Sequence, residues 1–306
     1  MAAKPDHVFA RDREWETLAR FVASTGPDVR LGVVTGRRRQ GKTFLLQSLV
    51  EAVGGFYFVG VESTSVDALR QFSAALGAWL GSGPLAFQDW HEAIVFLFDR
   101  CAGRTVVLDE FPYLLKAEPA IASIIQREID GRTQGAEATR LILAGSAMSI
   151  MGKLLAGQAP LRGRASLDLV VQPFDYRTAA RFWDLTDPRL AARVDAVVGG
   201  TPAYRTRFVN NEAPGKLDEF DDWVIRRVLD LASPLFREAR YLLSNEGDIR
   251  DEALYHAVLG AIAAGNSTRG GIAGRKLPSG AVRRPSFVPV TPMKPSALSY
   301  HGDISS

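Results

Sequence analysis

The sequence predicts an α/β fold in which a five-stranded parallel sheet carries helices on both faces and is followed by helices alone. Five short apolar runs, rich in β-branched residues, alternate with longer amphipathic stretches in the first half of the chain. A glycine-rich turn directly follows the first run, and a pair of carboxylates ends the third. Strands are expected at 30–35, 56–61, 105–110, 140–146 and 166–172, and helices at 9–24, 44–53, 65–80, 89–101 and 119–130.

The glycine-rich turn has the sequence GRRRQGKT and precedes a helix that starts with Phe44; it comprises Gly36, Arg37, Arg38, Arg39, Gln40, Gly41, Lys42 and Thr43. A strand, this turn and a helix in succession form a loop that wraps the phosphates of ATP or GTP. The glycines let backbone N–H groups face an anion, and the helix N-terminus adds partial positive charge. Lys42 is expected to reach the β- and γ-phosphates, and Thr43 to hold Mg²⁺. The three arginines are expected to point outward, toward acids of the helical region.

The carboxylate pair is Asp109 and Glu110, at the end of the predicted third strand. Sites in α/β sheets lie at the carboxyl ends of the strands, so Asp109 is expected to hold Mg²⁺. Glu110 is the candidate base that orients and polarises an attacking water, because phosphoryl transfer depends mainly on positioning and charge neutralisation. The alternative is that the two carboxylates only cap the strand in solvent.

Ser146 ends the predicted fourth strand, directly after Gly145. The strand count fits the branch of phosphate-loop proteins in which one strand is inserted between the loop strand and the acidic strand and ends in a polar sensor. Ser146 would be that sensor, and the alternative is an N-cap of the next helix.

Composition limits the class of protein. The chain has 306 residues, 46% hydrophobic and 23% charged, which is an ordinary globular mix. The single cysteine, Cys101, excludes an intrachain disulfide and fits a reducing compartment, so a cytoplasmic location is expected. No apolar run approaches the roughly 20 residues that span a bilayer, and no membrane partner is expected. The net charge of +3 permits nucleic-acid contact without indicating it.

The predicted organisation has four parts. Residues 1–173 form the nucleotide-binding domain, and 174–245 form a helical lid with helices at 175–184, 188–198, 203–210 and 216–232. Residues 246–277 hold a partial helix-turn-helix or winged helix, with helices at 251–264 and 268–276, for which a packing hairpin of the lid is the alternative. Residues 278–306, with five prolines and several serines, read as a disordered tail.

Together these motifs resemble the prokaryotic AAA-type ATPases of the archaeal ATPase family, a STAND-like group of phosphate-loop proteins. The resemblance covers residues 9–275. It rests on the phosphate loop, the acidic strand and four further segments: Phe9 with Asp12-Arg13-Glu14-Trp15-Glu16, Ala144-Gly145-Ser146, Leu161-Arg162-Gly163-Arg164, and Gly199-Gly200-Thr201-Pro202 with Tyr204.

The resemblance implies roles beyond those drawn from spacing. Pro202 would approach the adenine, and Arg13 and Glu14 would lie on the side of the base. Arg164 or Arg162 would stabilise charge on the γ-phosphate, from the same subunit or from a neighbour. Family members usually continue into a winged helix and often a nuclease-like domain. This chain ends before completing either, so a C-terminal truncation is expected, and the incomplete winged helix counts against a DNA partner.

The leading prediction is an Mg²⁺-dependent ATPase whose hydrolysis drives a conformational switch. ATP is preferred over GTP on the resemblance, since the sequence has no N-K-x-D motif to read guanine. The alternatives are a non-hydrolysing ATP-binding switch, an ATP-controlled DNA-binding regulator and, more distantly, a small-molecule kinase. A protein partner or self-association is expected, but the sequence names neither.

Overall fold

The computed structural model describes residues 2–25, 29–132, 139–238, 241 and 252–274. Internal contacts divide the chain into two compact units, Met1–Arg250 and Asp251–Ser306. The first unit contains both the predicted nucleotide-binding domain and the predicted lid. The predicted tail at 278–306 lies outside the described residues.

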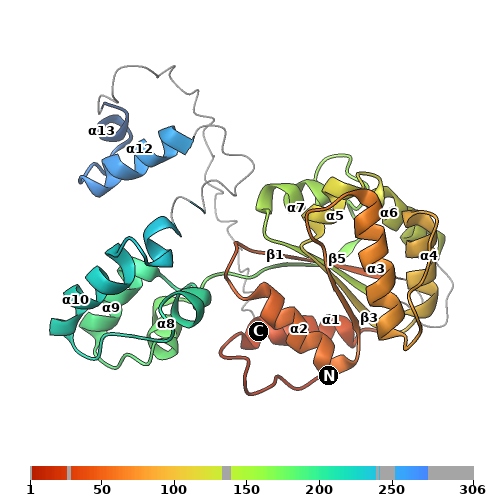
Figure 1. Cartoon of the computed structure of the whole chain (residues 1–306), viewed down its shortest axis with the longest axis horizontal. Coiled ribbons are helices and arrows are strands. Elements are labelled where there is room, and N and C mark those ends of the chain that lie inside the picture. The colour runs from red at the N-terminus through yellow and green to blue at the C-terminus, as the bar shows by residue number, and fades with distance from the viewer. Residues whose placement is uncertain (1, 26–28, 133–138, 239–240, 242–251, 275–306) are drawn as a thin grey trace, which may run out of the picture. The chain divides into compact units, whose positions relative to one another are not determined.

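The first unit is built on a five-stranded parallel sheet with helices packed around it (Figure 1). The order of its strands is β2-β3-β4-β1-β5. The fourth strand therefore lies between the loop strand and the acidic strand, and the prediction of an inserted strand is confirmed. The strands are β1 (Arg30–Thr35), β2 (Phe56–Val59), β3 (Thr105–Asp109), β4 (Arg140–Gly145) and β5 (Ala165–Val170).

Helices cover both faces of this sheet, as predicted. Alternate residues of a strand point to opposite faces, so Val34, Val107 and Ile142 pack with α1 and α2. Val33, Val106 and their neighbours pack against the helices of the other face. The helices are α1 (Asp12–Val22), α2 (Lys42–Val53), α3 (Ser65–Trp79), α4 (Trp90–Arg100), α5 (Phe111–Ala117), α6 (Ile121–Gly131) and α7 (Met148–Leu155).

The short helix α5 was not predicted, and the helix expected after Ser146, α7, was given no range. The first-turn position of Pro112 in α5 explains one omission, because proline reads as a helix breaker although it is tolerated in the first turn. The helices α5 and α7 begin two and three residues, respectively, beyond the carboxyl end of a strand. They fix the backbone that carries the candidate site.

The lid part of the first unit is helical, as predicted, but less regular. The expected helix at 216–232 is wrong as a single element, because it divides into 3₁₀, α and π segments. Trp183 and Trp223 meet edge to face in its core, with ring centres 5.8 Å apart. Its elements are α8 (Tyr176–Phe182), α9 (Pro188–Val198), η1 (Tyr204–Phe208), η2 (Leu217–Glu219), α10 (Phe220–Val224), η3 (Ile225–Leu229) and η4 (Pro234–Arg237).

The second unit contains α12 (Glu252–Ala263) and α13 (Arg269–Gly274). The turn between them uses Gly265 with a φ of 91°, and the Thr268 hydroxyl accepts a hydrogen bond from the backbone N–H of Gly271. Two helices were predicted here, but a recognition helix would fall in the part of the chain that is not described. Within the described residues, no helix has the length and apolarity that crossing a membrane requires.

Candidate active site

The phosphate loop connects β1 to α2 and has a backbone that requires glycine at its start. Gly36 has a φ of 147°, and a side chain there would place its Cβ 2.5 Å from the carbonyl oxygen of Val171. Gly41, with a φ of 86°, is the N-cap of α2 and offers no side-chain acceptor. The first N–H groups of α2 are therefore left for another partner, which makes this helix end suited to an anion.

Lys42 lies inside the loop. Its ammonium group donates hydrogen bonds to the carbonyl oxygens of Gly36 at 2.6 Å and Arg37 at 3.1 Å, and the residue is 5% exposed. Burial lowers the pKa of Lys42, while the charges of Glu110 and Asp109 raise it. Burial removes the solvation that stabilises the charged ammonium group. A phosphate bound beside this group would stabilise its charge instead.

Asp109 ends β3 as a fully buried carboxylate, so a solvent-exposed cap is excluded. Its Oδ2 accepts hydrogen bonds from the hydroxyls of Thr43 at 2.7 Å and Tyr57 at 2.6 Å, and its Oδ1 accepts the backbone N–H of Glu110 at 2.8 Å. Burial first, and then the charge of Asp109, raises the pKa of Tyr57, so its phenol remains a proton donor. Carboxylate and hydroxyl oxygens at this spacing are the hard donors that Mg²⁺ prefers, so the pair fits that ion.

The described residues hold no group of three or more His, Cys, Asp or Glu side chains arranged to bind a metal.

Glu110 follows Asp109 and adopts a left-handed backbone with a φ of 48°, which is unfavourable for a residue with a side chain. This conformation turns the chain into α5 and directs the carboxylate toward β4. Ser146 follows β4, and its hydroxyl lies 3.2 Å from Oε1 and 3.1 Å from Oε2 of Glu110. The N-cap of α7 is Ala147, which makes no side-chain cap, so the capping alternative for Ser146 is wrong.

The lid contacts the phosphate loop at two residues. The Nε2 of Gln40 donates to the hydroxyl of Thr201 at 3.1 Å, which brings the turn that contains Pro202 beside the loop. Arg39 forms an ion pair with Glu238, and its guanidinium lies 4.5 Å from the ring centre of Phe208. The expectation that a loop arginine meets a lid acid therefore agrees with the structure for Arg39.

The other arginines and Phe44 of the loop segment remain on its outside. Arg37 and Arg38 are exposed, and Arg38 donates to the Tyr113 hydroxyl at 3.1 Å. Phe44 is half exposed and meets the ring of His7, whose centre is 5.6 Å away. None of these side chains faces the inside of the loop.

Arg13 is exposed on α1, whereas Arg11, which sequence reasoning missed, reaches the loop. Arg11 donates to Glu14 at 2.7 Å, to the carbonyl oxygen of Gln172 at 2.7 Å and to that of Gln40 at 2.9 Å. Its guanidinium also lies 4.4 Å from the ring centre of Phe174.

Arg164 lies away from the loop. It makes two hydrogen bonds to the carboxylate of Asp130, at 2.6 and 2.7 Å. It directly precedes β5, whose first residue is paired with Leu31 near the start of β1, while the loop follows Thr35 at the other end. About four residues of strand, roughly 13 Å, separate these levels. In this structure Arg164 therefore does not reach the phosphate loop of its own subunit. Whether it acts on a phosphate of the same or of a neighbouring subunit stays a prediction. Arg162 donates to the carbonyl oxygen of Gly157 at 2.6 Å in the same segment.

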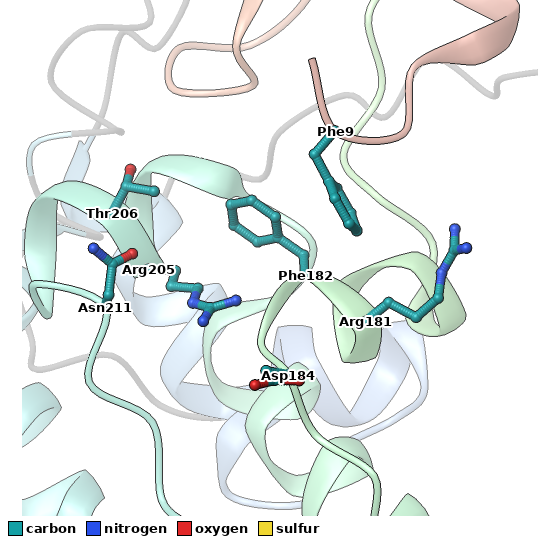
Figure 2. Close-up of a pocket in the computed structure, with 7 residues that line it drawn as sticks. All are labelled: Phe9, Arg181, Phe182, Asp184, Arg205, Thr206 and Asn211. Atoms are coloured by element: carbon teal, nitrogen blue, oxygen red, sulfur yellow. The ribbon is translucent and has the colours of Figure 1, made fainter. Parts of the chain in front are cut away.

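A pocket of about 340 Å³ lies where the N-terminal segment meets the lid. Figure 2 shows the side chains that line it. The rings of Phe9 and Phe182 lie 5.3 Å apart between centres, and the guanidinium of Arg205 lies 5.4 Å from the Phe182 ring. The Nε of Arg205 is buried without a hydrogen-bond partner among the described residues. The lining residues are Phe9, Arg181, Phe182, Asp184, Arg205, Thr206 and Asn211.

Comparison with known proteins identifies the fold. No protein-family model matches the chain. The curated "Uncharacterized protein MJECL04" of Methanocaldococcus jannaschii is 29% identical over 262 residues, which are 85% of this chain and 56% of that protein. The chain thus spans just over half the length of this relative.

Two solved structures match over most of the chain. The Walker-type ATPase PABY2304 of Pyrococcus abyssi is 19% identical, with 91% of this chain and 88% of that chain covered and a TM-score of 0.60. The ORC2 protein of Aeropyrum pernix in its ADP form is 15% identical, with 89% and 80% covered and a TM-score of 0.48. The first likeness, together with the strand order, shows a P-loop NTPase fold.

Proposed function

We propose that the protein is an Mg²⁺-dependent ATPase that uses ATP binding and hydrolysis to drive a conformational switch. The observation that carries the proposal is the convergence of Lys42, the Thr43–Asp109 pair and the Glu110–Ser146 pair at the carboxyl edge of β1, β3 and β4. These strands are neighbours in the sheet, so a buried cation, a pair of metal-binding oxygens and a second carboxylate lie around one loop.

Each group has a distinct role in this proposal. The loop N–H groups and Lys42 bind the phosphates, and Thr43 and Asp109 hold Mg²⁺, which neutralises charge on the phosphate oxygens when bound. Glu110 orients the attacking water and accepts its proton, while Ser146 fixes the Glu110 carboxylate from β4. Arg164 would act on the γ-phosphate of a neighbouring subunit.

The base of ATP lies, in this proposal, on the side of the loop where the N-terminal segment meets the lid. Thr201 contacts Gln40, so its neighbour Pro202 is close enough to the loop to border the nucleotide. Glu14 is held there by Arg11, whereas the exposed Arg13 would have to turn to take part. The choice of ATP over GTP follows the likeness to a Walker-type ATPase.

The proposed switch uses the contacts of Arg39 and Gln40 with the lid. Phosphates bound in the loop would bring negative charge close to Arg39, which forms an ion pair with Glu238 of the lid. They would also change the loop backbone at Gln40, which contacts Thr201 of the lid. Hydrolysis would then change the balance between lid-closed and lid-open states.

The test measures ATP binding and hydrolysis by the purified protein with Mg²⁺. Lys42→Ala should weaken ATP binding by about 10- to 100-fold, since hydrogen bonds to charged groups contribute roughly 1.5–3 kcal/mol. Glu110→Gln should retain binding and lose turnover by about 10²- to 10⁴-fold. Lys216→Ala and Glu51→Gln, which change exposed residues of the same types, are the matched controls.

Two results would contradict this proposal. Wild-type protein that binds no ATP would remove the nucleotide site altogether. Turnover that survives Glu110→Gln at the level of Glu51→Gln would remove the assigned base.

A non-hydrolysing ATP-binding switch is the second candidate. The position of Arg164 favours it, because its pair with Asp130 lies at the amino edge of the sheet, away from the loop. An isolated subunit would then bind ATP and turn it over only slowly. Tight ATP binding without turnover at any protein concentration would support this candidate over the ATPase.

A further inference from the structure

Tyr57 is the polar residue in the strand sequence FYFV of β2. Phe56 and Phe58 point into the core on one face of the sheet, and Tyr57 points to the other, where it packs with the residues around α2. In the register of β2 against β3, Tyr57 is opposite Val107 and Val59 is opposite Asp109. The tyrosine therefore starts two residues below Asp109 on the same face, and its long side chain spans that offset.

The hydroxyl of Tyr57 ends 2.6 Å from Oδ2 of Asp109, the oxygen that also accepts from Thr43. An ionised carboxylate offers about four acceptor sites. The hydroxyls of Tyr57 and Thr43 and the N–H of Glu110 occupy three of them. Among the described residues, these three contacts leave one acceptor site of the Asp109 carboxylate for a water molecule bound to the metal. The three contacts also fix the direction in which that site points.

We propose that Tyr57 is a positioning residue that holds the Asp109 carboxylate in the orientation that Mg²⁺ requires. The proposal rests on the proposed function, because it assigns a role in the same site. Without the Tyr57 hydroxyl, a second acceptor site of the Asp109 carboxylate would lose its donor. The plane of the carboxylate would then no longer be held by a contact from β2. Outer partners of metal ligands typically change metal affinity by about 10- to 100-fold when removed.

The experiment compares wild type with Tyr57→Phe, which keeps the ring and removes the hydroxyl. Binding of a fluorescent ATP analogue is titrated with Mg²⁺ and, separately, in EDTA. The Mg²⁺ concentration that gives half of the affinity gain should rise about tenfold or more in Tyr57→Phe. Affinity in EDTA should stay within about twofold of wild type, because the loop and Lys42 are untouched. A merely structural role would lower both affinities together.

Tyr176→Phe is the matched control, since it removes an exposed phenol of the lid whose hydroxyl donates to the carbonyl oxygen of Pro188 at 2.9 Å. It should behave as wild type in both titrations. Asp109→Asn supplies the second variant: if Tyr57 acts through Asp109, adding Tyr57→Phe to Asp109→Asn should change the Mg²⁺ dependence no further.

The outcomes separate this inference from the proposed function. Equal Mg²⁺ dependence in wild type and Tyr57→Phe overturns the role of Tyr57 and leaves the ATPase proposal standing. Equal losses with Mg²⁺ and in EDTA also overturn it, in favour of a packing role. Wild-type binding that does not respond to Mg²⁺ overturns both.

Discussion

The ion pair between Arg39 and Glu238 makes the stability of the lid depend on a residue of the phosphate loop. The Glu238 side chain is 5% exposed and that of Arg39 is 30% exposed. The Tyr204 hydroxyl lies 3.1 Å from Oε1 of Glu238, and the Phe208 ring lies under the guanidinium. Arg39→Ala would therefore leave a buried carboxylate with a neutral donor, Tyr204, in place of its cation.

The magnitude follows from this burial. Removing one partner of a fully buried ion pair costs about 3–5 kcal/mol. Partial exposure of Arg39 and the donor from Tyr204 reduce this cost to about 2–3 kcal/mol, and the lost cation–π contact adds roughly 0.5–1 kcal/mol. A total of about 3 kcal/mol corresponds to roughly a 10²-fold rise in the fraction of molecules with an open lid. Adding Glu238→Gln removes the stranded charge and should recover about 2 kcal/mol.

Hydrogen exchange of backbone amides in α8, α9 and α10 measures this opening. Arg207→Ala, which removes an exposed arginine of the same lid, is the control. The reasoning is refuted if Arg39→Ala exchanges no faster than Arg207→Ala. It is also refuted if Glu238→Gln gives no recovery, because the charge would then not be the source of the cost.

Three further predictions concern Gly200, the buried thiol and the neighbouring subunit. Gly200→Ala should destabilise the lid by at least about 2 kcal/mol in chemical unfolding, because its Cβ would lie 1.9 Å from the carbonyl oxygen of Phe174. Burial raises the pKa of the Cys101 thiol from 9.0 to about 12, so on raising the pH the unfolded chain loses this proton before the folded chain does. The free energy of unfolding should therefore fall by about 1.4 kcal/mol per pH unit between pH 9 and 12. In Cys101→Ala the free energy of unfolding should fall less steeply over the same pH range. Turnover per subunit should rise with protein concentration, and Arg164→Ala, which loses its pair with Asp130, should abolish that rise without lowering the thermal midpoint.

Much of the sheet and the centre of the site could be predicted because their signals are local. The phosphate loop, the acidic end of β3 and the serine after β4 each follow an apolar run, and parallel strands bring their carboxyl ends to one edge. The insertion of one strand between the loop strand and the acidic strand followed from the number of strands and from the acidic pair. These inferences needed no knowledge of contacts between distant parts of the chain.

The remaining site residues depend on distant contacts that a local pattern cannot show. Tyr57 lies in an apolar strand and reads as core until its register with β3 is known. In sequence, Arg11 and Arg13 are equally plausible partners of the loop. The left-handed backbone at Arg11 directs Arg11, and not Arg13, toward the loop. Arg164 matches a family motif, yet its level on the sheet follows from the pairing of β5 with β1.

The contacts of Gln40 indicate that nucleotide binding and lid position should be thermodynamically coupled. Its carbonyl oxygen accepts from Arg11 of the N-terminal segment at 2.9 Å, and its side chain donates to Thr201 of the lid at 3.1 Å. The same residue belongs to the loop that is proposed to surround the phosphates, so any shift of its backbone on binding alters both contacts. By thermodynamic reciprocity, a partner that holds the lid on the loop must change ATP affinity by the same factor by which ATP changes the affinity for that partner. Weakening the Gln40–Thr201 contact should therefore reduce this shared factor equally in both measurements. If the contact carries none of the coupling, the factor would stay the same in both.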